Sequence, residues 1–128
     1  MIHLDTSALV GALTGKRTAA PMLRRLIADG DRLAIATLVL YEWRRGPRTR
    51  DEIADQEAFV PSAVAVSFGS REAVAAADLY AHVPRARHRE IDIAIAACAI
   101  AHGAALWTLN PRDFADIPGL EVIASAAR

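Results

Sequence analysis

The sequence predicts an α/β fold in which helices cover both faces of a central parallel sheet, and three observations lead to this prediction. Short apolar segments alternate along the chain with longer segments of helical periodicity. The short segments lack the polar alternation of a half-exposed strand, so they fit strands buried on both faces. The chain has 128 residues, close to the size of one domain with one core, so we expect a single domain over residues 1–128.

The first part of the chain predicts two strands and three helices, each helix with a start or stop signal. Thr6 or Ser7 supplies an oxygen to the free N–H groups of the first helix, and Thr37 does so for the third. Gly30 and Gly46 mark the ends of the second and third helices. The expected ranges are a strand at 2–5, a helix from 8, a helix over 19–29, a strand over 32–36 and a helix over 38–46.

The remainder predicts three more helices and three more strands. Ser70 opens a helix that ends before Pro84, and a basic loop over 84–89 leads into the most apolar helix of the chain, which Gly103 terminates. The expected ranges are a helix over 51–58, a strand over 62–67, a helix over 70–82, a helix over 91–103, a strand over 104–109 and a strand over 120–123.

Acids and an amide stand where ligands bind in such folds, beyond the carboxyl ends of the strands. Asp5 follows the first strand, Glu42 lies one turn into the third helix, and Asp92 is the only acid from Ile91 to His102. Asn110 and Asp113 follow the strand that ends at Leu109. We interpret these as four strand-to-helix junctions that share one edge of the sheet.

Each of these residues also has a purely structural interpretation. Asp5 can cap a helix, Asp92 can complement the positive end of one, and Asn110 and Asp113 are ordinary turn residues. Glu42 can pair with a neighbouring arginine on the helix surface. Independent caps and turns need not converge on one edge, so their convergence favours a site.

Clustered carboxylates repel one another and are tolerated when cations bridge them. Oxygen ligands without cysteine or clustered histidine select Mg²⁺ or Mn²⁺ over zinc. Such sites activate water for phosphodiester hydrolysis. The acidic set therefore predicts a Mg²⁺ or Mn²⁺ site with nuclease chemistry.

Composition limits the partners and the compartment. The formal net charge is zero, so no global field draws the chain to nucleic acid, although arginines cluster over 44–50 and 85–89. The single cysteine, Cys98, excludes an internal disulfide and suits a reducing compartment. The amino terminus has no signal-peptide pattern, and no apolar run reaches the ~18 residues of a membrane span. We expect a cytoplasmic protein without a membrane segment.

Several ordered segments together resemble PIN-domain proteins, and more narrowly VapC-type toxins of bacterial toxin–antitoxin pairs. The matching segments are Leu4-Asp5-Thr6-Ser7-Ala8, the helix with Tyr41-Glu42 that ends at Gly46, the helix from Asp92 to Gly103, and Thr108 to Phe114 followed by Ile117-Pro118-Gly119-Leu120.

The resemblance implies a three-layer α/β/α fold, a Mg²⁺- or Mn²⁺-dependent endoribonuclease acting on single-stranded RNA, products with a 5′-phosphate and a 3′-hydroxyl, a homodimer, and a cognate antitoxin that occupies the active-site groove. Asp5, Glu42 and Asp92 correspond to metal ligands of the family. Where some relatives have a fourth acid this chain has Asn110, so we expect Asp113 to complete the site and Asn110 to orient it or the substrate. The supporting hydroxyls are Thr6, Ser7 and Thr108. The candidates for contact with the RNA backbone or the antitoxin are Arg44, Arg45, Arg85, Arg87 and Arg112.

Two alternatives remain beside the nuclease. Phosphoryl transfer through an aspartyl phosphate also places an acid after the first strand, but it normally needs a lysine near the phosphate, and the only lysine, Lys16, lies after the first helix. The second alternative is a catalytically degenerate PIN-like module that binds RNA or a partner. Asn110 supports this module, and the contexts of Asp5, Glu42 and Asp92 argue against it.

Overall fold

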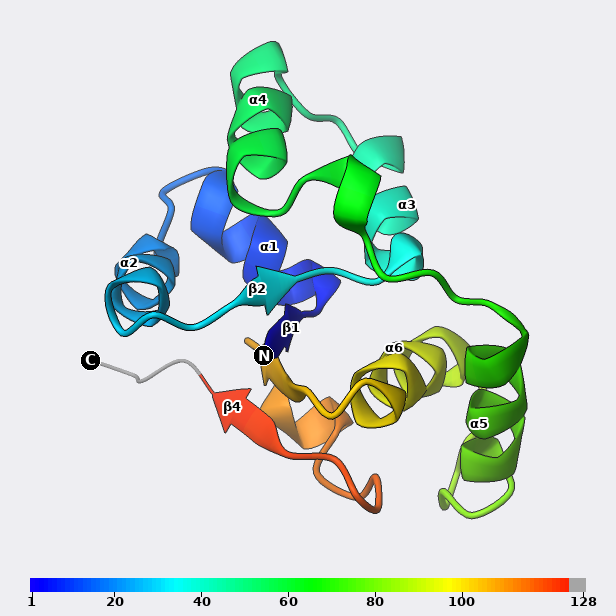
Figure 1. Ribbon diagram of the computed structural model, residues 1–128. Helices are drawn as coiled ribbons and strands as arrows, with labels where there is room; N and C mark the ends of the chain where they lie inside the picture. The colour runs from blue at the N-terminus through cyan, green and yellow to red at the C-terminus, as the bar shows by residue number, and fades with distance from the viewer. Residues whose placement is uncertain (125–128) are drawn as a thin grey trace.

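The structure, a computed structural model, describes residues 1–124 and is built around a four-stranded parallel sheet in the order β2-β1-β3-β4. Helices α1 and α2 lie on one side of the sheet and α5 and α6 on the other (Figure 1), so the predicted α/β/α layering is confirmed. The strands are β1 (Ile2–Leu4), β2 (Leu33–Ala34), β3 (Ala105–Thr108) and β4 (Val122–Ala124).

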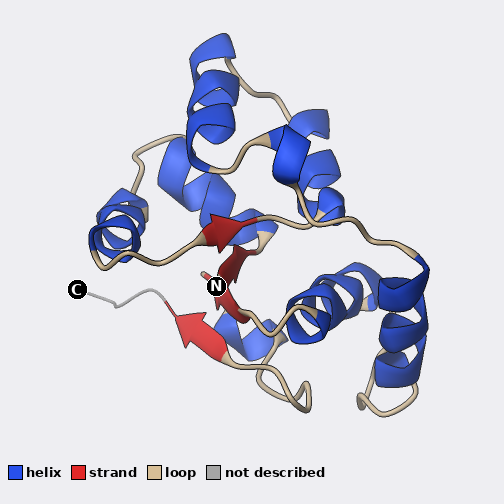
Figure 2. Cartoon of the chain, in the orientation of Figure 1, coloured by secondary structure: helices blue, strands red, loops and turns tan. Residues whose placement is uncertain are grey.

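Two groups of helices connect the strands, as the colouring by secondary structure in Figure 2 makes visible. One pair links β1 to β2, and four helices link β2 to β3. Among residues 1–124, none of the helices has the length and hydrophobicity needed to cross a membrane. The helices are α1 (Thr6–Leu13), α2 (Ala20–Ala28), α3 (Thr37–Arg45), α4 (Arg50–Phe59), α5 (Ser70–Tyr80) and α6 (Glu90–Ala101), with 3-10 turns at Ser62–Val64 and Pro111–Asp113.

The register of the two central strands brings their carboxyl ends together. Leu4 of β1 is paired with Trp107 of β3, and the Asp5 N–H donates to the Trp107 carbonyl at 3.0 Å. The residues that follow each strand, Asp5 and Leu109, therefore leave the sheet side by side. This edge is the one at which we expected the acidic residues to meet.

The strand expected over residues 62–67 is wrong. Residues Ser62–Val64 form a 3-10 turn, and only Val66 makes a parallel bridge, with Ala36. The Ser62 hydroxyl donates to Glu57 of α4 at 2.5 Å, and the Ser62 N–H donates to the same carboxylate at 2.9 Å. These bonds hold the start of the segment against a helix, so it is not available to the sheet.

Two helix starts also differ from the expectation. Helix α1 begins at Thr6 rather than Ala8, and its cap is Asp5, whose side chain accepts from the Ala8 N–H. Thr37 is the first residue of α3 and not its cap, because its hydroxyl accepts a hydrogen bond from the Phe68 N–H at 3.1 Å. The cap of α1 is a local contact that the usual cap rule covers, one residue earlier than expected, whereas the difference at Thr37 comes from a tertiary partner that a local rule does not consider.

The position of helix α6 in the fold accounts for its apolar sequence. It lies between α5 and the sheet, and all residues from Ile93 to Ala99 are buried. A helix buried on all sides has no polar face, so it has no amphipathic pattern. Its first turn brings Asp92 to the edge of the sheet where Asp5 lies.

His3, in the centre of β1, is fully buried, and neither ring nitrogen has a hydrogen-bond partner among residues 1–124. Burial of the ring, followed by the charges of His102 and of the amino terminus, lowers the pKa of His3 to about 4. In an unfolded chain a histidine titrates near 6.5. Between pH 6.5 and pH 4 the unfolded state binds a proton at His3 that the folded state does not bind. The free energy of unfolding therefore falls as the pH falls.

We therefore expect His3→Leu to remove an acid sensitivity of the fold. Between pH 7 and pH 5 the parent should lose about 2 kcal/mol of unfolding free energy that the variant keeps. Urea unfolding at the two pH values measures this difference. His82→Gln, at an exposed residue after α5, should behave as the parent does. Equal pH dependence in His3→Leu and the parent would contradict the prediction.

Candidate active site

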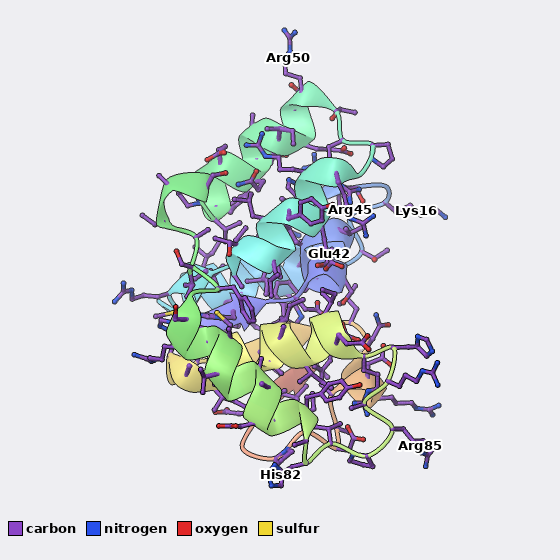
Figure 3. The ribbon with its side chains drawn as sticks, turned by 90° about the vertical axis from the view of Figure 1, so that its right-hand side faces the viewer. Lys16, Glu42, Arg45, Arg50, His82 and Arg85 are labelled. Carbon is purple, nitrogen blue, oxygen red and sulfur yellow. The ribbon has the colours of Figure 1, made fainter. Side chains whose placement is uncertain are left out.

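The acidic residues line one cavity of about 580 Å³ at the carboxyl edge of the sheet. The cavity lies between the start of α1, the middle and end of α3, the start of α6 and the turn after β3. Figure 3 shows Glu42 and Arg45 together on α3. The lining residues are Asp5, Thr6, Ser7, Glu42, Arg45, Gly46, Pro47, Arg48, Asp92, Ile95, Asn110, Asp113 and Phe114.

Asp5 is the most buried acid of the cavity, with 4% of its surface exposed. Its Oδ1 accepts from the Ala8 N–H at 2.9 Å and from the Ser7 hydroxyl at 2.7 Å, and its Oδ2 accepts from the Thr108 hydroxyl at 2.6 Å. Burial raises the pKa of Asp5, and these hydrogen bonds oppose the rise. Asp5 is thus both a helix cap and a rigid wall of the cavity.

Ser7 and Thr108 connect Asp5 to the turn that follows β3. The Ser7 hydroxyl accepts from the Leu109 N–H at 3.0 Å, and the Thr108 hydroxyl accepts from the Asn110 N–H at 2.9 Å. Each hydroxyl therefore donates to Asp5 and accepts from the backbone of the turn. The position of Asn110 is coupled through these bonds to that of Asp5.

Glu42 is held from the opposite side of the cavity by Thr6. The Thr6 hydroxyl donates to Glu42 Oε1 at 2.5 Å, so the first residue of α1 orients a carboxylate on α3. The alternative interpretation, a surface ion pair with Arg44 or Arg45, is not what residues 1–124 show, because neither arginine bonds to Glu42.

The pKa of Asp92 is raised by its surroundings in the cavity. Burial, and then repulsion by Asp113, Asp5 and Glu42, raise the pKa of Asp92 to about 6, while Arg89 acts in the opposite direction. Each of the other three acids therefore contributes to the negative potential at Asp92. The expectation that Asp92 lies at a strand-to-helix junction is wrong, because α6 follows α5 and the loop after it.

Asp113 and Asn110 enter the cavity from the 3-10 turn after β3, and both are exposed. Arg89 holds this turn against the start of α6. One guanidinium nitrogen donates to the Asp113 carbonyl at 3.0 Å and to Asp116 at 2.7 Å, and the other donates to Asp116 and to the Pro84 carbonyl at 3.0 Å each. The sequence pattern did not single out Arg89, because these partners become neighbours only in the fold.

The donor types fit a hard divalent cation, since carboxylate and amide oxygens are the ligands that Mg²⁺ and Mn²⁺ prefer. These donors are farther apart than the ligands of a complete coordination shell. Within residues 1–124, no three histidine, cysteine, aspartate or glutamate side chains are gathered closely enough to hold a metal ion as they stand. The cavity therefore has suitable donors around a common space without a preformed coordination shell.

The five arginines expected to contact RNA or an antitoxin are placed differently. Only Arg45 lines the cavity. Arg44 faces α4, where it donates to Gln56 at 3.2 Å and pairs with Glu57 at 2.5 Å. Arg85 projects from the loop before α6, away from Glu42 (Figure 3). Arg87 and Arg112 are exposed and lie outside the cavity lining. One further arginine, Arg48, does line the cavity.

Comparison with known protein families identifies the family to which this chain belongs. A family model described as the PIN domain matches residues 2–120, which is nearly the whole chain. The chain belongs to the PIN domain family. The four acidic side chains of this PIN domain, Asp5, Glu42, Asp92 and Asp113, all lie within the matched residues.

Individual relatives agree with the family. Ribonuclease VapC19 of Mycobacterium tuberculosis is 36% identical over 121 residues, which cover 92% of this PIN domain and 95% of the relative. The solved structure of VapBC-5 from the same species, a member of the VapBC family of toxin–antitoxin systems, is 27% identical with a TM-score of 0.63, over 95% of this chain and 96% of that one. VapBC2 from Rickettsia felis, bound to a DNA fragment from its promoter, has a TM-score of 0.76 at 22% identity over 97% and 98% of the two chains, and shows the shared fold.

Proposed function

We propose that this PIN domain is an endoribonuclease that hydrolyses single-stranded RNA with the help of Mg²⁺ or Mn²⁺. The observation that carries the proposal is the cavity itself, which is lined by acidic side chains from α3, α6, the residue after β1 and the 3-10 turn after β3. Burial, and then repulsion by the other acids, raise the pKa of Asp92 in this cavity to about 6. Membership of the PIN family and the likeness to Ribonuclease VapC19 support the same chemistry.

Asp5, Glu42, Asp92 and Asp113 are the residues that would hold the cation. A bound divalent ion supplies positive charge for the developing charge on the phosphodiester and lowers the pKa of a water nucleophile. The four carboxylates fix where the cation would bind in the cavity. A phosphodiester that binds beside it would be positioned for in-line attack by water.

The hydroxyl groups around the cavity orient these acids. Thr6 orients Glu42, and Ser7 and Thr108 orient Asp5, so neither acid must lose rotamer freedom when RNA binds. Asn110 presents an amide at the cavity rim beside Asp113, where it orients that acid or hydrogen-bonds the RNA. Arg45 faces the same space and contacts the RNA backbone.

By the same proposal the protein is the toxin of a cytoplasmic toxin–antitoxin pair. It acts as a homodimer, and a cognate antitoxin neutralises it by occupying the cavity. The solved structures that share its fold include several VapBC complexes, which supports an antitoxin partner.

A catalytically degenerate module that binds RNA or a partner is the second candidate. Two observations favour it: Asn110 is an amide at the position where the family resemblance implies a fourth acid, and residues 1–124 contain no preformed coordination shell. The two functions differ in one respect that is simple to measure, which is cleavage.

The test is cleavage of an end-labelled pool of single-stranded RNAs by the purified protein, freed of any co-purifying antitoxin, with Mg²⁺, Mn²⁺ or EDTA. We expect cutting in either metal and none in EDTA, with 5′-phosphate and 3′-hydroxyl product ends. Absence of cutting under every condition would favour the non-catalytic module. Cutting that persists in EDTA would reject the role of the metal.

A further inference from the structure

We infer that Arg48 is a preset phosphate-binding residue, which holds the backbone of the RNA substrate on the wall of the cavity beside the acids. This inference rests on the proposed ribonuclease function and adds a substrate contact to it. Arg48 comes three residues after α3 and lines the same cavity as Asp5, Glu42, Asp92 and Asp113.

Arg48 is held in place by Trp43. Its Nε donates to the Trp43 carbonyl at 2.9 Å, and its guanidinium carbon lies 4.4 Å from the centroid of the Trp43 ring. The Trp43 side chain is fully buried, so the surface beneath the guanidinium is part of the core. A cation fixed in this way loses little conformational freedom when it binds a ligand.

The other two nitrogens of Arg48 have no partner among residues 1–124. In that part of the chain no carboxylate pairs with Arg48, although Arg17, Arg44 and Arg89 pair with Asp55, Glu57 and Asp116. The outer edge of the guanidinium is thus left for a ligand. A guanidinium edge with two parallel N–H donors matches the geometry of a phosphate group.

Gly46 leaves the space that the guanidinium occupies. A Cβ at this position would lie 2.7 Å from Arg48 Nη2 and 2.9 Å from Cζ, both too close for non-bonded atoms. Any side chain at residue 46 would therefore push the guanidinium away from its place at the cavity wall. Arg45, by contrast, is exposed, with its guanidinium 5.8 Å from the Tyr41 ring.

The charges of the cavity explain why the ligand is RNA backbone. The acids repel a phosphate, so the substrate needs positive charge at more than one place to enter. The proposed cation would offset the negative charge of the phosphodiester beside the acids, and Arg48 binds a neighbouring phosphate of the same strand. A residue of this kind contributes to affinity without regard to base sequence.

The test measures binding without cleavage. A fluorescent single-stranded RNA is titrated with the Asp92→Asn protein, which leaves the RNA uncut, and anisotropy is followed over a series of salt concentrations. Adding Arg48→Gln should weaken binding about tenfold and should lower the slope of log affinity against log salt by about 0.7, the value for one phosphate contact with a single strand. Arg24→Gln, on the exposed face of α2, should change neither quantity.

A second variant separates placement from charge. Gly46→Ala retains every charge and moves the guanidinium, and because the displaced atoms are the end of a flexible side chain, the fold should keep its urea midpoint. We expect it to weaken RNA binding several-fold at one salt concentration. If Arg48→Gln loses affinity because it unfolds, its urea midpoint falls in the same measurement. The RNA affinity of Gly46→Ala then decides whether the placement of the guanidinium matters for binding.

Three results would overturn the inference. Arg48→Gln that binds RNA with the affinity and salt slope of its parent is one, and an Asp92→Asn protein that binds no RNA is another. Polyglutamate that binds better than RNA, and loses its binding in Arg48→Gln, would assign Arg48 to an acidic peptide instead. Failure of the proposed function is a separate result, seen as absence of metal-dependent cleavage by the unchanged protein.

Discussion

Asp92→Asn should lose RNA cleavage by at least about 100-fold and at the same time be more stable than the parent at pH 7. Loss of a residue that merely supports a metal ligand costs up to about 100-fold, so loss of a ligand should cost no less. The gain in stability has a different origin. In the metal-free protein the Asp92 carboxylate is partly buried and is repelled by Asp113, Asp5 and Glu42.

The pH dependence follows from the pKa of about 6 that burial and repulsion give Asp92. An unfolded aspartate titrates near 4, so the folded protein is penalised for ionising Asp92 above pH 6, and the penalty disappears as the pH falls to 4. A shift of about two pKa units corresponds to ~3 kcal/mol, which solvent screening at this half-exposed side chain reduces to about 1 kcal/mol.

Urea unfolding of parent and variant in EDTA, at pH 7 and pH 4, measures this gain, and the RNA assay measures the loss of activity. The stability difference should be present at pH 7 and absent at pH 4. Asp29→Asn, at an exposed acid after α2, is the control and should leave cleavage unchanged. Parental cleavage by Asp92→Asn would remove this residue from the proposed site.

Mg²⁺ or Mn²⁺ should raise the melting temperature of the parent by about 10 °C when present at about 100 times its dissociation constant. A ligand at that concentration that binds only the native state stabilises it by about 2.7 kcal/mol. For a chain of this length, each kcal/mol corresponds to roughly 3–5 °C. The carboxylates that repel one another without metal should become mutually compatible when the ion is bound.

The same measurement decides which residue fills the fourth position. Asp113→Asn should lose most of the metal-dependent shift, whereas Asn110→Ala should retain it, because we assign the ligand role to Asp113. Sodium chloride at matched ionic strength should give no comparable shift. An undiminished shift in Asp113→Asn would show that this acid is not a ligand, and no shift in the parent would favour the non-catalytic module.

Much of the fold and of the site was predictable from local patterns. The α/β class, the six helices and the four strands of the sheet follow from hydrophobic periodicity and from glycine and proline signals. The rule that parallel sheets bind ligands beyond the carboxyl ends of their strands placed Asp5 and Asn110 on a common edge. The same pattern failed at residues 62–67, where Ser62 is bonded to α4, residues Ser62–Val64 form a 3-10 turn, and only Val66 makes a parallel bridge, with Ala36.

What the sequence by itself determined is the six helices, the four strands of the sheet and the acids that stand in or beside them, because periodicity, capping and turn preferences act over a few neighbouring residues. Only the tertiary structure decided which side chains meet. The bonds of Thr6 to Glu42 and of Thr108 to Asp5, and the ion pair of Arg44 with Glu57, join residues of different elements. Such contacts depend on how elements pack across the whole chain, and no local pattern encodes that packing.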